Sequence, residues 1–164
     1  MRHWIRQPLP QHEEINVVFF RGMSLDTLTR GLLAAQRMPL AYGKGTEWGV
    51  MMHPMLSWKN DDYDLTNYGP LCRDGGELVV FVTEPCSAKG FPPDFDYYRD
   101  GRLLTCFSFE ALDYPGGDKP NLLLPALIEA KAVGPDADHD SGDYVERIAQ
   151  AITEFFELPE LDMP

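Results

Sequence analysis

The chain has 164 residues, which is enough for one domain with a full hydrophobic core and too few for two domains of ordinary size. Hydrophobic residues make up 44% and charged residues 24% of it, so the composition excludes extended disorder. The 26 acidic and 14 basic residues leave a net charge of −12, which repels nucleic acids and anionic lipids. We therefore expect no nucleic-acid or membrane partner.

The three cysteines predict neither a disulfide framework nor a zinc site, because Cys72, Cys86 and Cys106 include no Cys-x-x-Cys pair. The N-terminal segment lacks the apolar core of a secretory signal, and no apolar run reaches the length of a transmembrane helix. We expect a cytoplasmic protein that carries no cofactor.

The chain begins with residues 1–14, which are polar and interrupted by prolines, as is typical of an arm outside the domain. The apolar run 15–20 predicts the first strand. Ser24 then stands where a helix cap is expected, and the apolar residues after it recur at spacings of three and four, at Leu25, Leu28, Leu32 and Ala35. We expect this helix to run to about Arg37 and to pack on a sheet.

Residues 42–46 look like a phosphate loop, but Lys44 is followed by glycine instead of serine or threonine. The run 47–53 predicts a second strand, which Pro54 closes. From Leu56 to Cys72, aromatic and acidic residues alternate between turn-forming residues, so we predict a long surface connection.

The most definite part of the sequence is a hairpin. The run 78–82 predicts a central strand, and two further strand-like runs, 95–99 and 102–109, flank Asp100-Gly101. An Asp-Gly pair between two strands favours a type I′ turn, because both central residues of that turn need a positive φ.

Two helices are predicted near the C-terminus. Asn121 is placed to cap the first, with Pro125 in its first turn and Gly134 as its terminator. The second has Asp143 and Glu146 spaced as a capping box, and its apolar residues follow the helical spacing at Val145, Ile148, Ala149, Ile152, Phe155 and Phe156. Residues 159–164 are expected to form an acidic tail.

These elements predict a single α+β domain over residues 15–158. We expect a mainly antiparallel sheet of about five strands, with one helix after the first strand and two C-terminal helices packed on one face.

Four segments agree in order with one family. They are the strand-to-helix junction 19–30, the Trp48-Gly-Val strand with Pro54 behind it, the hairpin 98–107 and the helix start 122–127. In these segments the chain resembles a family of small uncharacterised actinobacterial proteins, classed as a domain of unknown function. The resemblance spans most of residues 15–158 and implies a shared fold, but it supplies no activity.

Residues 136–143 are the densest group of ligand-like oxygens, and their acids recur at every second residue as in a calcium loop. The register fails, because Ser141 stands where that loop needs glycine and Arg147 stands where it needs glutamate. We favour a solvated acidic linker that caps the last helix over a metal site.

Two other groups resemble catalytic pairs. His53 with Cys72 or Cys86 could serve as base and nucleophile, but no local signature surrounds either cysteine, so buried structural roles are favoured. Asp94 and Asp96 share one face of a strand and resemble a carboxylate pair for acid–base chemistry, yet we expect them on a solvated edge.

The connection from Leu56 to Tyr68 is the best candidate for a binding surface. Exposed tryptophan and tyrosine contribute much of the energy of protein interfaces, and neighbouring carboxylates attract basic partners. The alternative is that Trp58 folds back into the core. The candidate partner-binding residues are Trp58, Asp61, Asp62, Tyr63, Asp64 and Tyr68.

The sequence favours a non-enzymatic, acidic protein-binding module whose partner has a basic face, and an immunity-like or antitoxin-like role is its most concrete form. The alternative is a structural or assembly subunit of a phage or a larger complex, docked through its arm and tail. A metal-dependent enzyme that uses residues 136–143 is the third possibility.

Overall fold

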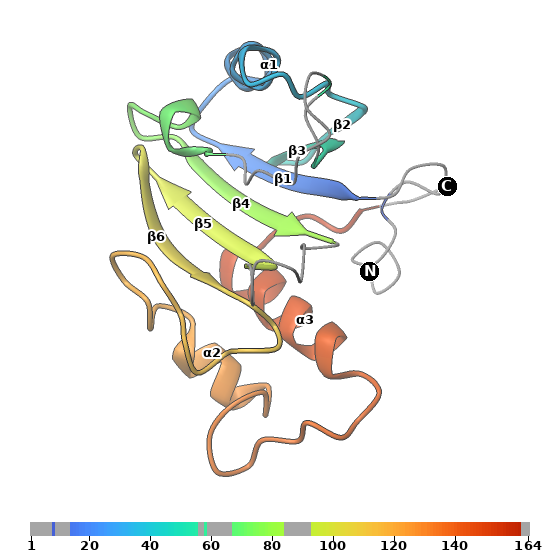
Figure 1. Cartoon of the computed structure of the whole chain (residues 1–164), viewed down its shortest axis with the longest axis vertical. Helices are drawn as coiled ribbons and strands as arrows, with labels where there is room; N and C mark the ends of the chain where they lie inside the picture. Colours follow the sequence, from blue (N-terminus) through green and yellow to red (C-terminus); the bar gives the residue numbers. More distant parts are fainter. Residues whose placement is uncertain (1–7, 9–13, 56–57, 59–66, 84–92, 162–164) are drawn as a thin grey trace.

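The computed structural model describes residues 8, 14–55, 58, 67–83 and 93–161. Within these residues there is one antiparallel sheet of six strands in the order β2-β3-β1-β4-β5-β6 (Figure 1). The elements are β1 (Ile15–Arg21), α1 (Leu25–Ala34), β2 (Ala41–Lys44), β3 (Gly49–Pro54), the 3-10 helix η1 (Gly69–Leu71), β4 (Glu77–Val82), β5 (Phe95–Arg99), β6 (Arg102–Phe107), α2 (Leu124–Glu129) and α3 (Tyr144–Phe156). The predicted α+β class, with a helix after the first strand and two C-terminal helices, is confirmed.

The sheet has one strand more than predicted, because β2 was not recognised in the sequence. This strand forms the edge of the sheet and pairs antiparallel with β3, with Tyr42 opposite Met51. Gly43 interrupts its four residues, and glycine weakens the strand signal of a sequence. Pairing with β3 therefore stabilises a strand whose own sequence has a low β propensity.

β1 lies inside the sheet and is buried on both faces. Its odd-numbered residues, such as Val17, pack in the core with α2 and α3, whereas even-numbered ones, such as Val18, pack with α1. A strand covered on both faces is expected to be mostly apolar, and Asn16 is the one polar residue within 15–20. The sheet thus separates two hydrophobic cores, with α1 on one side and the C-terminal helices on the other (Figure 1).

The predicted hairpin joins β5 and β6. Asp100 and Gly101 have φ angles of 52° and 81°, so both central residues adopt the positive φ that a type I′ turn requires. Arg99 and Arg102 face each other across the turn, and the register shifts between Tyr97 and Tyr98. The local prediction of this turn is confirmed.

α1 begins as predicted, because the Ser24 Oγ accepts a hydrogen bond from the Thr27 N–H at 3.0 Å. It ends at Ala34, short of the predicted Arg37. The chain turns at Gln36, whose φ of 61° is incompatible with a continuing right-handed helix.

The two C-terminal helices begin without their predicted side-chain caps. Asn121 contributes only its backbone carbonyl, which accepts a hydrogen bond from the Leu124 N–H at 3.1 Å. Asp143 is the N-cap residue of α3, but its carboxylate accepts a hydrogen bond from Arg147 Nε at 3.1 Å and makes no cap bond. The capping box predicted with Glu146 is therefore wrong, because the arginine competes for the carboxylate.

Of the predicted arm, residues 1–14, the structure describes only Pro8 and Glu14, and of the predicted tail it describes residues 159–161. Among all described residues, no helix has both the length and the apolar character needed to cross a membrane.

Candidate functional site

Trp58 lies at the surface beside the C-terminal end of α1. Its side chain is 57% exposed, and its backbone N–H donates to the Gln36 carbonyl at 3.0 Å. Leu33 and Met38, which lie on either side of Gln36 in the chain, are 39% and 51% exposed. Trp58 therefore does not fold into the core. We call Leu33, Met38 and Trp58 the Trp58 surface.

Arg37, which follows α1, makes two hydrogen bonds to backbone carbonyls. The side chain is buried, and its guanidinium donates from Nε to the Met55 carbonyl and from Nη1 to the Ala35 carbonyl, both at 2.9 Å. Met55 directly follows β3, so the arginine ties the end of that strand to the end of α1. The Met55 carbonyl is 18 residues away from Arg37, and a partner at that distance leaves no local signal in the sequence.

The remaining predicted binding residues have different outcomes. Asp61, Asp62, Tyr63 and Asp64 lie outside the residues that the structure describes. Tyr68 is 1% exposed and packs in the core on the α1 side of the sheet, where its ring lies 5.8 Å from that of Tyr98. Its side chain is therefore not available on the surface.

Tyr68 is the centre of a buried polar network with His53 and Asn16. His53 Nδ1 lies 2.8 Å from the Pro54 carbonyl, and a carbonyl can only accept, so Nδ1 carries the proton. Nε2 must then accept the hydrogen bond from the Tyr68 hydroxyl at 2.7 Å. The same hydroxyl accepts a hydrogen bond from Asn16 Nδ2 at 2.8 Å, whereas Asn16 Oδ1 has no hydrogen-bond partner among the described residues.

The network is unsuited to acid–base catalysis. Burial lowers the pKa of the fully buried His53 to about 4, and the charge of Arg37 acts in the same direction, so the imidazole is neutral at neutral pH. Asp96 lies on β5, three strands away from β3, which corresponds to about 14 Å at the usual spacing of strands. The sheet therefore does not bring His53 and this aspartate together.

The cysteines give no activated nucleophile among the described residues. Burial raises the pKa of both the Cys72 and the Cys106 thiol, which disfavours the reactive thiolate. Cys72 donates to the Gly69 carbonyl at 3.6 Å in the core. Cys86 lies outside the described residues.

Asp94 directly precedes β5 and Asp96 lies within it, but neither is on the solvated edge that we expected. β5 is an inner strand between β4 and β6, and both carboxyls are partly buried. Burial raises the pKa of Asp94 to about 6, although its Oδ2 accepts a hydrogen bond from the Phe109 N–H at 2.6 Å. Burial and the charge of Asp94 raise the pKa of Asp96 to about 7. Asp96 can therefore exchange a proton near neutral pH.

The acidic segment 136–143 contacts an arginine side chain. Arg147 Nη1 donates to the carbonyls of Ala130 and Lys131 at 2.9 and 3.0 Å, and Nη2 donates to Asp138 O and Ser141 Oγ. Together with the bond from Nε to Asp143, the contacts with Asp138 and Ser141 bind the guanidinium to this segment. In the part of the chain that is described, no three His, Cys, Asp or Glu side chains are grouped to hold a metal.

Comparisons with protein-family models, with curated proteins and with solved structures find no significant match to this chain. The resemblance to the actinobacterial family therefore stays a prediction, and the site has to be interpreted from its own chemistry.

Proposed function

We propose that the protein is a non-enzymatic acidic module that binds a protein partner with a basic face, in an immunity-like or antitoxin-like role. The observation that supports this most is the Trp58 surface, where a tryptophan more than half exposed has its backbone N–H bonded to the Gln36 carbonyl. Exposed tryptophans are costly to leave in water, and they are enriched among the residues that dominate binding energy. Leu33 and Met38, which lie on either side of Gln36 in the chain, are also exposed.

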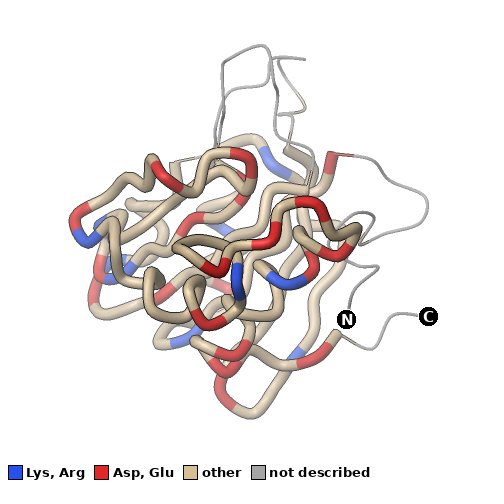
Figure 2. The backbone as a smooth tube through the Cα atoms, turned by 90° about the horizontal axis from the view of Figure 1, so that it is seen from below, with Lys and Arg blue, Asp and Glu red and all other residues tan. Residues whose placement is uncertain are grey.

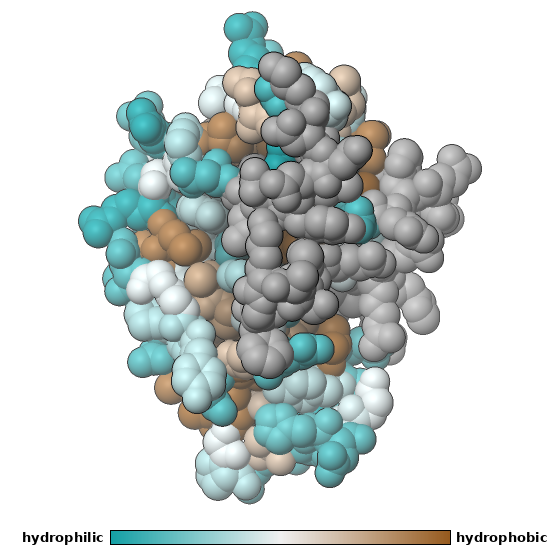
Figure 3. Space-filling model, viewed as in Figure 1, coloured by the Kyte–Doolittle hydropathy of each residue, from teal (hydrophilic) through white to brown (hydrophobic). Residues whose placement is uncertain are grey.

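The negative net charge of the chain favours a partner with a basic surface. Acidic residues outnumber basic ones along the described backbone (Figure 2), and Asp61, Asp62 and Asp64 follow Trp58 closely in the sequence. A negative surface accelerates encounter with a positive one and disfavours acidic competitors. On the face shown in Figure 3, the described apolar residues form small separate groups between hydrophilic ones, so charge and a few apolar contacts would act together.

We also propose a cytoplasmic location. Cys72 and Cys106 are both free thiols, and unpaired cysteines are typical of proteins in reducing compartments.

The test compares Trp58→Ala with Tyr114→Ala, because Tyr114 is also an exposed aromatic residue, at 84%. Each tagged variant is expressed in the native host, and co-purified proteins are quantified by mass spectrometry. We expect Trp58→Ala to reduce recovery of one basic protein by about tenfold or more, since central interface aromatics contribute at least 2 kcal/mol. The melting temperature should change by no more than about 2 °C.

Tyr114→Ala should recover that protein as the wild type does, and 0.5 M NaCl should weaken the wild-type complex. Equal recovery with both variants would refute the role of the Trp58 surface, and recovery that does not depend on salt would refute the role of charge.

A further inference from the structure

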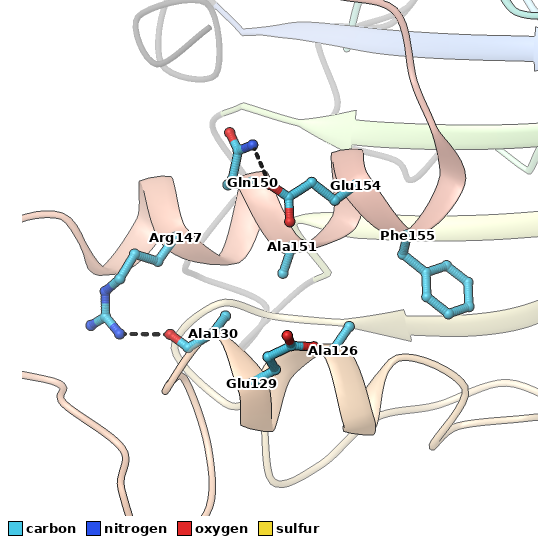
Figure 4. Close-up of a pocket in the computed structure, with 8 residues that line it drawn as sticks. All are labelled: Ala126, Glu129, Ala130, Arg147, Gln150, Ala151, Glu154 and Phe155. Atoms are coloured by element: carbon cyan, nitrogen blue, oxygen red, sulfur yellow. Dashed lines mark hydrogen bonds between the residues drawn. The ribbon is translucent and has the colours of Figure 1, made fainter.

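A second surface lies between α2 and α3, on the opposite side of the sheet from α1. The two helices form a groove with a volume of about 480 Å³ (Figure 4). Its lining residues are Ala126, Glu129, Ala130, Arg147, Gln150, Ala151, Glu154 and Phe155. The groove therefore combines small apolar residues with charged ones.

The two walls each carry one glutamate. Glu129 projects from α2 and Glu154 from α3, between Arg147 at one end and Phe155 at the other (Figure 4). Glu154 Oε1 accepts a hydrogen bond from Gln150 Nε2 at 2.7 Å, which orients the carboxylate. In the described part of the chain, neither glutamate forms a salt bridge, so both negative charges remain available.

Arg147 does not neutralise these carboxylates. Its guanidinium is held by the backbone carbonyls of Ala130 and Lys131 and by the Asp143 carboxylate. The cation therefore closes one end of the groove while its charge is already compensated by Asp143. An incoming positive group would be attracted to the part of the groove nearer Phe155.

The apolar part of the groove suits the stem of a long side chain. Ala126, Ala130 and Ala151 leave room between the helices because their side chains are single methyl groups. Phe155 is 44% exposed and presents an aromatic ring at the end of this space. A methylene chain can pack on such methyl groups while its charged end meets the carboxylates.

We infer that the groove binds an arginine side chain of a partner protein. Its stem lies on the three alanines, and its guanidinium lies between Glu129 and Glu154 near the Phe155 ring. Arginine fits better than lysine, because a planar guanidinium can donate to two carboxylates on opposite walls and stack on an aromatic ring. This inference goes beyond the proposed function and does not depend on the Trp58 surface, which lies on the other side of the sheet.

The test uses an acetylated, amidated peptide of alternating arginine and alanine, with citrulline-for-arginine and lysine-for-arginine peptides for comparison. Binding to the full chain at low ionic strength is followed by NMR of the alanine methyl groups. We expect the arginine peptide to shift the Ala126, Ala130 and Ala151 methyl signals saturably, the lysine peptide to bind more weakly and the citrulline peptide not to bind.

Glu129→Gln and Glu154→Gln should each raise the Kd about threefold to fivefold, as expected for an exposed ion pair. Glu110→Gln removes one exposed charge elsewhere and should change the Kd less than twofold. Equal effects of all three variants, equal binding of the lysine peptide, or shifts spread over the whole surface would each overturn the inference. Such results would leave the Trp58 test unaffected, so the two proposals can fail separately.

Discussion

Replacing Tyr68 with phenylalanine is expected to lower the free energy of unfolding by about 3 kcal/mol, although it removes a single oxygen atom. The hydroxyl donates to His53 Nε2 at 2.7 Å and accepts from Asn16 Nδ2 at 2.8 Å. Without it, both buried polar atoms lose this partner, and each such loss costs about 1–3 kcal/mol. Urea unfolding followed by tryptophan fluorescence measures the change.

Tyr114→Phe is the control, because the Tyr114 ring is 84% exposed, and its free energy of unfolding should stay within about 0.5 kcal/mol of the wild type. A loss below 0.5 kcal/mol for Tyr68→Phe would show that the buried network contributes little. Partner recovery should be unchanged in this variant, since Tyr68 is in the core; loss of the partner from a folded Tyr68→Phe protein would restore its predicted binding role.

Replacing Asp96 with asparagine is expected to stabilise the protein by about 2 kcal/mol at pH 8. The folded state raises the pKa of this carboxyl to about 7, above its value in the unfolded chain, so protonation favours folding. This contribution is fully present below about pH 4 and is lost as the pH rises through about 7. A shift of about three pKa units corresponds to about 4 kcal/mol, which partial exposure to solvent reduces. Asparagine stays neutral at every pH, so the substitution removes the cost of burying a charged carboxylate at pH 8.

The same substitution should make stability more sensitive to acid. The folded pKa of His53 is lowered to about 4, so its contribution is present above about pH 6.5 and is lost as the pH falls through about 4. In the wild type, the raised pKa values of Asp94 and Asp96 oppose this trend. Asp96→Asn removes one of these two opposing contributions, so stability should fall more steeply between pH 6.5 and 4.

Urea unfolding between pH 4.5 and 8 checks both effects. Asp140→Asn makes the same change of charge at an exposed position and is the matched control, with an expected effect below about 0.5 kcal/mol at every pH. Destabilisation by Asp96→Asn at pH 8, or a pH profile equal to that of Asp140→Asn, would contradict the account of this carboxyl.

The features that sequence predicted correctly depend on residues close together in the chain. Asp100-Gly101 specifies a turn because the turn itself requires positive φ, and Ser24 specifies a helix start because its hydroxyl reaches the Thr27 N–H. Local chemistry of this kind needs no knowledge of the rest of the fold.

The features that sequence missed depend on distant partners. Arg37 binds the carbonyl of Met55, Arg147 binds those of Ala130 and Lys131, and no pattern in the sequence joins these positions. Tyr68 sits in a segment whose alternating aromatic and acidic residues suggested exposure, but its contacts with His53 and Asn16 place it in the core. The sequence left two alternatives for Trp58, exposed on the surface or buried in the core, because composition does not determine which aromatic residues are buried.

The proposal that the chain binds a basic protein through the Trp58 surface is tested most directly by native mass spectrometry of the tagged protein, purified from its native host at low salt. The expected result is a complex that contains one additional basic protein, is absent from the Trp58→Ala preparation and dissociates at high salt. A monomer alone, or an oligomer of this chain alone, in the wild-type preparation would contradict the proposal.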